Sequence, residues 1–229
     1  MHVKTEPAIL YFGTPVVLIS TVNEDGSYNV APMSSAFWLG WRCILGLAAV
    51  SQTPLNMTRT RECVLNLASV DNVEAVNRLA RTTGTNPVPE VKLRRGYRYV
   101  RDKFATADLT PIESETVAAP RIKECPVQME ARIEAVHGLA DDDPQQRGQR
   151  QIFEVRVSRI FVDHDILSKQ DQNRVDPDKW RPLIMSFQNF YGLEAGQVHD
   201  SELGKIPEHL YRGPDVDRAR SEPTLAPVS

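Results

Sequence analysis

The sequence lacks the charge and cysteine patterns that mark several large classes of protein. Lys and Arg number 27 against 30 Asp and Glu, for a formal net charge of −3. Because proteins that bind the phosphate backbone normally carry a basic field, we expect no nucleic-acid partner. The three cysteines form no CxxC pair, which argues against a structural zinc site and a disulfide framework. This cysteine content fits a reducing, cytoplasmic environment.

Long apolar runs are also absent. The N-terminal stretch MHVKTEPAILYFG carries one Lys and a short apolar run, which does not match a signal peptide. No run approaches the roughly 20 residues that a membrane-spanning helix needs. With 41% hydrophobic and 25% charged residues, the chain is typical of a globular protein. Neither a composition break nor a repeat divides it, so we predict one domain over residues 1–212. Residues 213–229 are predicted to be a flexible tail or a partner-binding strap.

β structure dominates the first third of the chain. The stretch PVVLISTV (15–22) is an apolar strand, and NEDG (23–26) after it is typical of a hairpin turn in which Gly26 adopts a positive φ. The chain returns through residues 27–39, and CILGLAAV (43–50) suits a strand covered on both faces. The returning stretch is unusual because it carries Pro32 and two serines among its apolar residues.

Helices are predicted after these strands. Thr53 is a candidate N-cap with Pro54 as the first helical residue. Residues 64–69 form a short strand, and residues 71–84 form an amphipathic helix that ends at Gly84. Residues 85–124 mix Pro, charge and aromatics without a period, so we predict a loop with short helical turns.

Two longer strands follow in the second half. From Val127 apolar and polar residues alternate, as in a strand with one solvated face. In the next strand the parity changes between Val157 and Ile160, which predicts a β-bulge near Ser158 or Arg159. Several antiparallel strands with interposed helices indicate a mainly β fold with helices, arranged as a barrel.

The common catalytic and nucleotide-binding motifs are missing. The sequence contains no GxGxxG, GxxxxGK[ST], HExxH or GxSxG, so dinucleotide or ATP binding by those routes has no support. Asp163, His164 and Asp165 are adjacent and form either a metal corner or a solvated cluster at a strand end. We favour the solvated cluster and predict no metal site.

An anion site is possible where the first helix begins. Its free N–H groups and the positive end of its dipole would attract an anion, and hydroxyl and cationic side chains lie nearby. The alternative is an ordinary capped helix with solvated arginines, and the spacing alone favours this alternative. The side chains concerned are Ser51, Thr53, Thr58, Arg59 and Arg61.

Four segments in order make the chain similar to the flavin reductase-like family. They are PVVLISTVNEDGSYNVAPMSSAF, SQTPLNMTRTRECVLNL, DKFATADLTPIES and PRIKECPVQMEARIE. The resemblance covers about residues 10–165 and implies a homodimeric split β-barrel, a Greek-key-type antiparallel barrel with helical elaborations. It also implies FMN near the subunit interface, reduced by NADH or NADPH without a Rossmann domain.

The resemblance assigns a role to several residues of this chain. It implies that the flavin ring and ribityl chain lie along residues 31–35, with the phosphate at residues 51–56 and either Thr58 or Arg59 adding to it. Lys103 and Phe104 would lie near the flavin or the partner subunit. The implied cofactor-binding residues are Ala31, Pro32, Met33, Ser34, Ser35, Ser51, Gln52, Thr53, Asn56, Thr58, Arg59, Lys103 and Phe104.

The chain departs from the family pattern at WRPLIMSFQNFYGLEAG (180–196). Its aromatic residues either cover the flavin face or pack against the barrel, and both alternatives are open. They are Trp180, Phe187, Phe190 and Tyr191.

The resemblance implies an NAD(P)H-dependent flavin reductase that transfers hydride from nicotinamide to flavin N5. Reduced flavin could then pass to a flavin-dependent monooxygenase. The alternatives are a flavoenzyme with tightly bound FMN that acts on a small organic substrate, and a non-catalytic flavin or electron carrier. No catalytic side chain is assigned, because the cofactor carries the chemistry in such enzymes.

Overall fold

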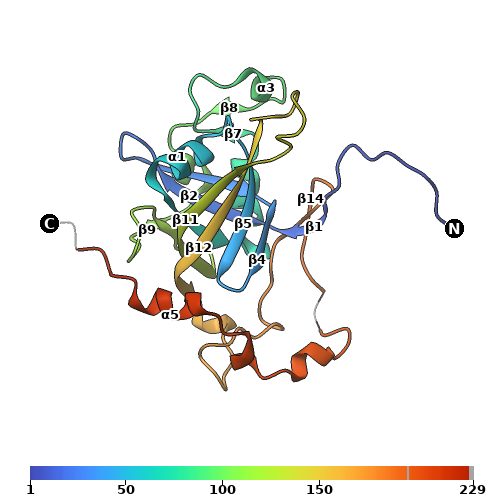
Figure 1. Cartoon of the computed structure of the whole chain (residues 1–229), viewed down its shortest axis with the longest axis vertical. Helices are drawn as coiled ribbons and strands as arrows, with labels where there is room; N and C mark the ends of the chain where they lie inside the picture. Colours follow the sequence, from blue (N-terminus) through green and yellow to red (C-terminus); the bar gives the residue numbers. More distant parts are fainter. Residues whose placement is uncertain (195, 227–229) are drawn as a thin grey trace.

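The computed structural model describes residues 1–194 and 196–226. A seven-stranded antiparallel sheet, in the order β3-β2-β6-β11-β12-β5-β4, curls into a barrel at its centre (Figure 1). The 23–26 turn joins β2 to β3, with Gly26 at φ 79°, which confirms the predicted hairpin. The strands of this sheet are β2 (Val17–Val22), β3 (Tyr28–Met33), β4 (Ala36–Leu39), β5 (Arg42–Ala48), β6 (Glu62–Leu67), β11 (Val127–Gly138) and β12 (Arg150–Val162).

The sheet is split between β3 and β4. These strands are its two edges, although only Ser34 and Ser35 separate them in sequence. We predicted continuous β structure over residues 27–39, and the structure divides it here. The Gly46 N–H donates to Ser35 O at 2.9 Å, and Ser35 Oγ donates to Gly46 O at 2.6 Å. Because β3 is at the end of the sheet order, one of its edges pairs with no strand of this sheet. Pro32 has no backbone N–H, and it is tolerated in β3 because an edge strand does not need every backbone N–H for pairing.

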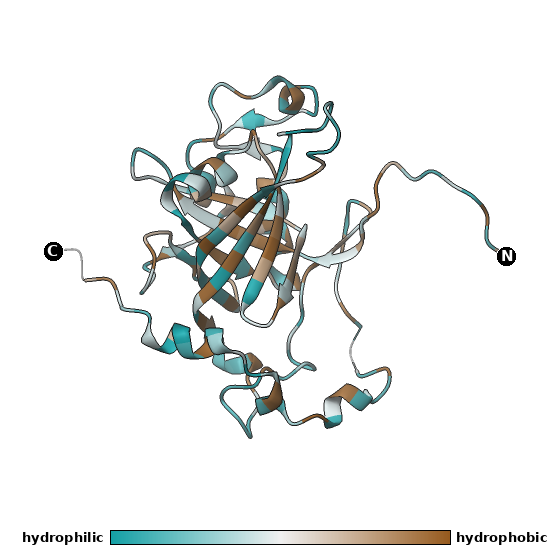
Figure 2. Cartoon of the chain, in the orientation of Figure 1, coloured by the Kyte–Doolittle hydropathy of each residue, from teal (hydrophilic) through white to brown (hydrophobic). Residues whose placement is uncertain are grey.

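Apolar side chains fill the barrel. Leu45, Leu65 and Phe153 are fully buried in its main cluster, and Figure 2 shows the hydrophobic residues along the barrel strands. Glu130 pairs with Arg159 while Ala131 pairs with Val157. Ser158 is therefore the extra residue of β12, which confirms the predicted β-bulge.

A second apolar cluster lies between the barrel and two short helices. It joins Leu18 and Val30 to Leu79 of α2 (Val73–Leu79) and Phe104 of α4 (Lys103–Ala107). The predicted helix over 71–84 is too long, because Arg81 adopts φ 55° and the chain then forms β7 (Thr82–Thr83). Strand β7 pairs in parallel with β8 (Arg98–Tyr99). The remaining short elements of this half are η1 (Val70–Asn72), α3 (Glu90–Leu93), β9 (Pro111–Ile112) and β10 (Arg121–Ile122).

The C-terminal section returns along the barrel. Strands β1 (Phe12–Pro15), β13 (Ile184–Ser186) and β14 (Asn189–Tyr191) form a small separate sheet. Helix α5 (Pro214–Ser221) then lies against β12, where Arg42 Nε donates to Asp215 at 2.9 Å. The segment predicted to be a flexible tail or a partner-binding strap thus contains helix α5, and residues 227–229 of it lie outside the described part. The intervening 3₁₀ turns are η2 (His164–Ile166), η3 (Glu202–Lys205) and η4 (Glu208–Tyr211).

Candidate functional site

Helix α1 (Gln52–Thr60) begins earlier than the sequence predicted. Its N-cap is Ser51, whose side chain makes no capping hydrogen bond. Thr53 lies within the first turn of α1 and is not the cap, and its hydroxyl accepts from Asn29 Nδ2 at 3.1 Å. The first turn of α1 holds no acidic residue, so the positive end of the helix dipole is not offset within the turn.

A buried polar network joins α1 to the hairpin of β2 and β3. Asn29 Nδ2 also donates to Thr21 Oγ1 at 3.2 Å, and Asn56 Nδ2 donates to the same oxygen at 3.0 Å. Gln52 Nε2 donates to Asn56 Oδ1 at 2.9 Å. These bonds fix the orientation of the Asn29 amide. Its nitrogen faces the network, and its oxygen is left for another donor.

That donor is Lys103, at the first position of α4. Its side chain is buried, with the residue 2% exposed, and its Nζ lies 3.4 Å from Asn29 Oδ1. In the described part of the chain, the lysines that form ion pairs are Lys179 and Lys205. Burial and the nearby charge of Lys92 lower the pKa of Lys103 to about 7. A buried ammonium without a carboxylate is unfavourable, so an anionic ligand would stabilise its charged form.

Lys92 is a second cation at this network that the sequence analysis missed. Its Nζ donates to Thr83 Oγ1 at 3.1 Å, and burial lowers its pKa. Gly84 follows Thr83, and a Cβ there would lie 2.9 Å from Asn29 Oδ1. In the sequence, the polar run TTGT (82–85) could have indicated that this segment contributes to a polar site. Lys92 itself lies in the charged run KLRR, which looks like a solvated surface.

The predicted wall for the flavin ring lies along the open side of the sheet. Ala31, Pro32 and Met33 are half-buried on the unpaired edge of β3, and Ser34 is half-buried just beyond it. Ser35 is exposed, and its hydroxyl is already bonded to Gly46. The predicted wall for the flavin ring and the polar network at Asn29 therefore share one strand, because Asn29 also belongs to β3.

Three of the predicted residues lie apart from this network. Thr58 and Arg59 are exposed on α1, and Arg59 Nη2 donates to Val22 O at 2.5 Å. Phe104 is buried in the second apolar cluster, where its ring centroid lies 6.2 Å from that of Tyr28. By contrast, Gln52, Thr53, Asn56 and Lys103 come together around Asn29, with Ser51 half-buried at the start of α1.

The four C-terminal aromatics divide into two pairs. Trp180 packs against the barrel cluster and Phe190 against the second cluster. Phe187 is 38% exposed and Tyr191 55% exposed. The Phe187 ring meets Phe12 edge-on, with centroids 4.8 Å apart. Packing therefore accounts for Trp180 and Phe190, while Phe187, in the turn between β13 and β14, and Tyr191, at the end of β14, are exposed.

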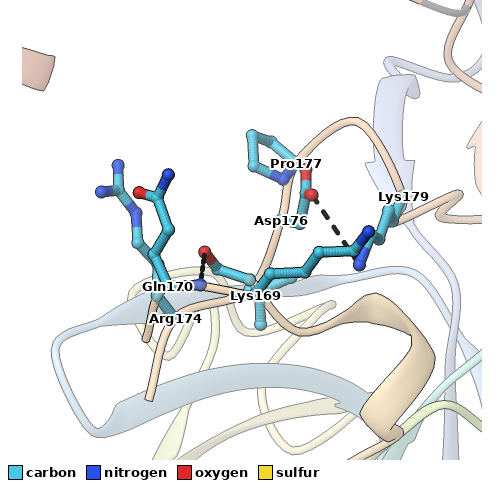
Figure 3. Close-up of a pocket in the computed structure, with 8 residues that line it drawn as sticks. Lys169, Gln170, Arg174, Asp176, Pro177 and Lys179 are labelled. Carbon is cyan, nitrogen blue, oxygen red and sulfur yellow. Dashed lines mark hydrogen bonds and ion pairs between the residues drawn. The ribbon is translucent and has the colours of Figure 1, made fainter. Parts of the chain in front are cut away.

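A basic pocket of about 520 Å³ lies in the loop after β12, at the end of the barrel away from α1 (Figures 1 and 3). Its cations include Lys169, Arg174 and Lys179. Lys179 Nζ donates to Leu167 O at 2.8 Å and lies 4.0 Å from Asp176. Figure 3 shows Asp176 and Lys179 turned toward each other. Because these charges are exposed or already engaged, this pocket is a weaker anion site than the network at Lys103.

The described residues, 1–194 and 196–226, hold neither a metal-binding cluster nor a helix that could span a membrane. They contain no group of three or more His, Cys, Asp or Glu side chains placed to hold a metal ion. His164 is exposed and lies 3.9 Å from Asp165, as expected of a solvated cluster at a strand end. No helix in residues 1–194 or 196–226 has the length and apolar character needed to cross a bilayer.

Known proteins share both the sequence pattern and the fold. A protein of Bacillus subtilis (strain 168) described as uncharacterized protein YdfE is 37% identical over 201 residues, which are 87% of this chain and 94% of the relative. Flavoredoxin of Desulfovibrio vulgaris (Miyazaki F) superposes with a TM-score of 0.70 at 20% identity, covering 90% of this chain and all of that chain. Nitrilotriacetate monooxygenase component B from Bacillus cereus superposes with a TM-score of 0.65 at 22% identity, covering 85% and 89%.

These similarities agree with the architecture described above. The fold is a mainly β split barrel of the kind found in flavin reductases. The family model for the flavin reductase like domain matches residues 9–194, most of the chain. The protein belongs to the flavin reductase-like family.

Proposed function

We propose that this protein is an NAD(P)H-dependent flavin reductase that binds FMN between the free edge of β3 and the start of α1. The observation that carries the proposal is Lys103, a buried cation held by Asn29 without a carboxylate partner among the described residues. The family supplies the flavin chemistry, and the network supplies a place for a charged group of the flavin. NADH and NADPH are both retained as hydride donors.

The residues of this chain fit such a ligand. The half-buried stretch Ala31, Pro32 and Met33 offers small side chains and the unpaired backbone groups of an edge strand to a flat ring. The Ser51 hydroxyl and the first N–H groups of α1 would bind an anionic group together with Lys103. When bound, the flavin would supply the hydride-accepting centre, while the protein positions it and its partner.

Association with a second copy and with an oxygenase are parts of the same proposal. Phe37 and Leu39 of edge strand β4 are 53% and 73% exposed, and exposed apolar side chains next to the proposed site are suited to a homodimer contact. Because a structural neighbour is named component B of a monooxygenase, we propose a flavin-dependent monooxygenase as a recipient of reduced flavin. The three cysteines are free and buried, in keeping with a proposed cytoplasmic location.

Anaerobic titration of the purified protein with NADH and with NADPH, followed by flavin absorbance, tests the proposal. A flavin reductase should oxidise one of these nucleotides faster as FMN is added. No oxidation with either nucleotide would refute the reductase activity. Flavin that survives dialysis and turns over with an organic substrate would favour the tightly bound flavoenzyme, and bound flavin without nucleotide turnover would favour a carrier.

A further inference from the structure

We propose that the N-terminal arm of one copy of this chain pairs with the free edge of β4 in a second copy, and that two copies exchange their arms reciprocally. The N-terminal arm is the segment before β1, residues 1–11. This inference rests on the homodimer of the proposed function and names the two segments that make the contact.

The N-terminal arm has few contacts with the chain to which it belongs. Within the described part of the chain, no hydrogen bond or ion pair joins residues 1–10 to any other residue. The arm is first anchored at Tyr11, whose carbonyl accepts from the Phe187 N–H at 2.8 Å. Figure 1 shows the arm leading away from the barrel. Leu10 is 69% exposed and Tyr11 48% exposed, so apolar side chains of the arm lack a partner.

Strand β4 is an apolar edge that also lacks a partner. It is the last strand in the order of the large sheet, and its four residues AFWL include no charge and no proline. Phe37 and Leu39 are 53% and 73% exposed. The opposite edge, β3, carries Pro32, which interrupts pairing there. An exposed apolar edge without such protection is a template for pairing with another chain.

The arm and the edge match each other in length and chemistry. The arm ends in the apolar run AILY (8–11), four residues like β4, and isoleucine and tyrosine favour strand structure. A strand added to a free edge gains main-chain hydrogen bonds, and its side chains cover those of the edge. The arm carries one Lys and one Glu, so apolar burial would hold it in place.

A second copy is the occupant that satisfies both segments. The arm leads away from β4 of its own chain (Figure 1), whereas two copies related by a twofold axis can each supply an arm and an edge. Reciprocal exchange produces two equal contacts and a closed dimer. Strand β4 also borders the split in the sheet opposite β3, so this contact is continuous with the side of the barrel where the flavin is proposed to bind.

Cross-linking between two single-cysteine variants of the full-length chain tests the exchange. One sample carries Leu10→Cys and the other Leu39→Cys, and a thiol-specific cross-linker with a flexible spacer is added. The three natural cysteines are buried, so the new thiols should react first. We expect a covalent dimer in the mixed sample and little in either sample alone. A covalent dimer of Leu39→Cys alone would show direct contact between two β4 edges and overturn the arm exchange, as would the absence of a mixed product.

Light scattering over a concentration series provides a second readout. The wild type should reach twice the chain mass of 25.8 kDa, and Leu10→Asp or Leu39→Asp should weaken dimerisation by about tenfold or more. Leu203→Asp is the matched control, because Leu203 is 67% exposed in η3, and it should dimerise like the wild type.

The outcomes separate this inference from the proposed function. A dimer that Leu10→Asp does not weaken would overturn the arm exchange and leave the homodimer standing. A wild type that remains at 25.8 kDa would overturn both. Oxidation of NADH or NADPH with FMN, measured on the same samples, tests the reductase activity separately.

Discussion

Replacing Lys103 by Met should stabilise the flavin-free protein while weakening the binding of FMN. Lys103 is 2% exposed, and its pKa falls from 10.5 to about 7 because of burial and the charge of Lys92. Below pH 10.5 the unfolded chain binds a proton at this residue that the folded chain releases near pH 7. The unfavourable contribution of this proton to folding is on the order of 4 kcal/mol at pH 7. Methionine fills a similar volume without the charge.

The sign of the pH dependence follows from the same values. Since the folded-state pKa is lowered, the destabilisation is fully present below about pH 7 and disappears as the pH rises through 10.5. The pH-dependent advantage of Lys103→Met should therefore fall from about 4 kcal/mol at pH 7 to about 2 kcal/mol at pH 9. Subtracting wild type from variant at each pH removes the contributions of most other groups.

Urea unfolding of both proteins without flavin, at pH 7 and pH 9, measures this difference. FMN titration of the same samples should show at least a tenfold loss of affinity in Lys103→Met, because a charge-assisted hydrogen bond contributes about 1.5 to 3 kcal/mol. Lys169→Met is the control, and removal of that exposed charge should change stability by less than about 0.5 kcal/mol. An unchanged or lower stability of Lys103→Met at pH 7 would refute the claim that Lys103 is an uncompensated buried cation.

Three further changes test other parts of the structure. Gly84→Ala should lower stability by about 1 to 3 kcal/mol and weaken FMN binding, since its Cβ would lie 2.9 Å from Asn29 Oδ1; wild-type behaviour in urea and FMN titrations would contradict the close approach. Glu130→Gln should cost about 2 to 4 kcal/mol in urea unfolding, because this fully buried carboxylate accepts two backbone N–H bonds and a threonine hydroxyl bond; a loss below 1 kcal/mol would show that charge is unimportant there. Asp215→Ala should lower the free energy of unfolding by at most about 1 kcal/mol, but it should speed proteolysis of residues 192–213, because it removes the hydrogen bond from Arg42 to α5. Equal cleavage rates in variant and wild type would show that other contacts hold α5.

The long strands β11 and β12 could be predicted from the sequence because one-sided burial leaves a period of two, whereas β2 and β5 were predicted from short apolar runs. That period located the strand from Val127 and, through its change of parity, the extra residue Ser158. The first residue of α1 was harder to predict from the sequence. Thr53 has the right chemistry for an N-cap, but the helix begins at Gln52 with Ser51 as its N-cap, and the Thr53 hydroxyl accepts from Asn29. Local signals could not show this contact between distant segments.

By itself the sequence determined the mainly β fold and the hairpin at Gly26, because these depend on local periodicity and turn chemistry. The family resemblance, and not the periodicity, pointed to Gln52, Asn56 and Lys103. Only the tertiary structure decided which of those residues meet. It placed Lys103 beside the Asn29 amide, 74 residues away in sequence. It also placed Lys92 in contact with Thr83, in the segment between the paired strands β7 and β8. It also ordered α5 through the pair Arg42 and Asp215, 173 residues apart. A pattern along the chain reports which face of an element is buried, whereas the partner of a buried charge depends on how distant segments pack.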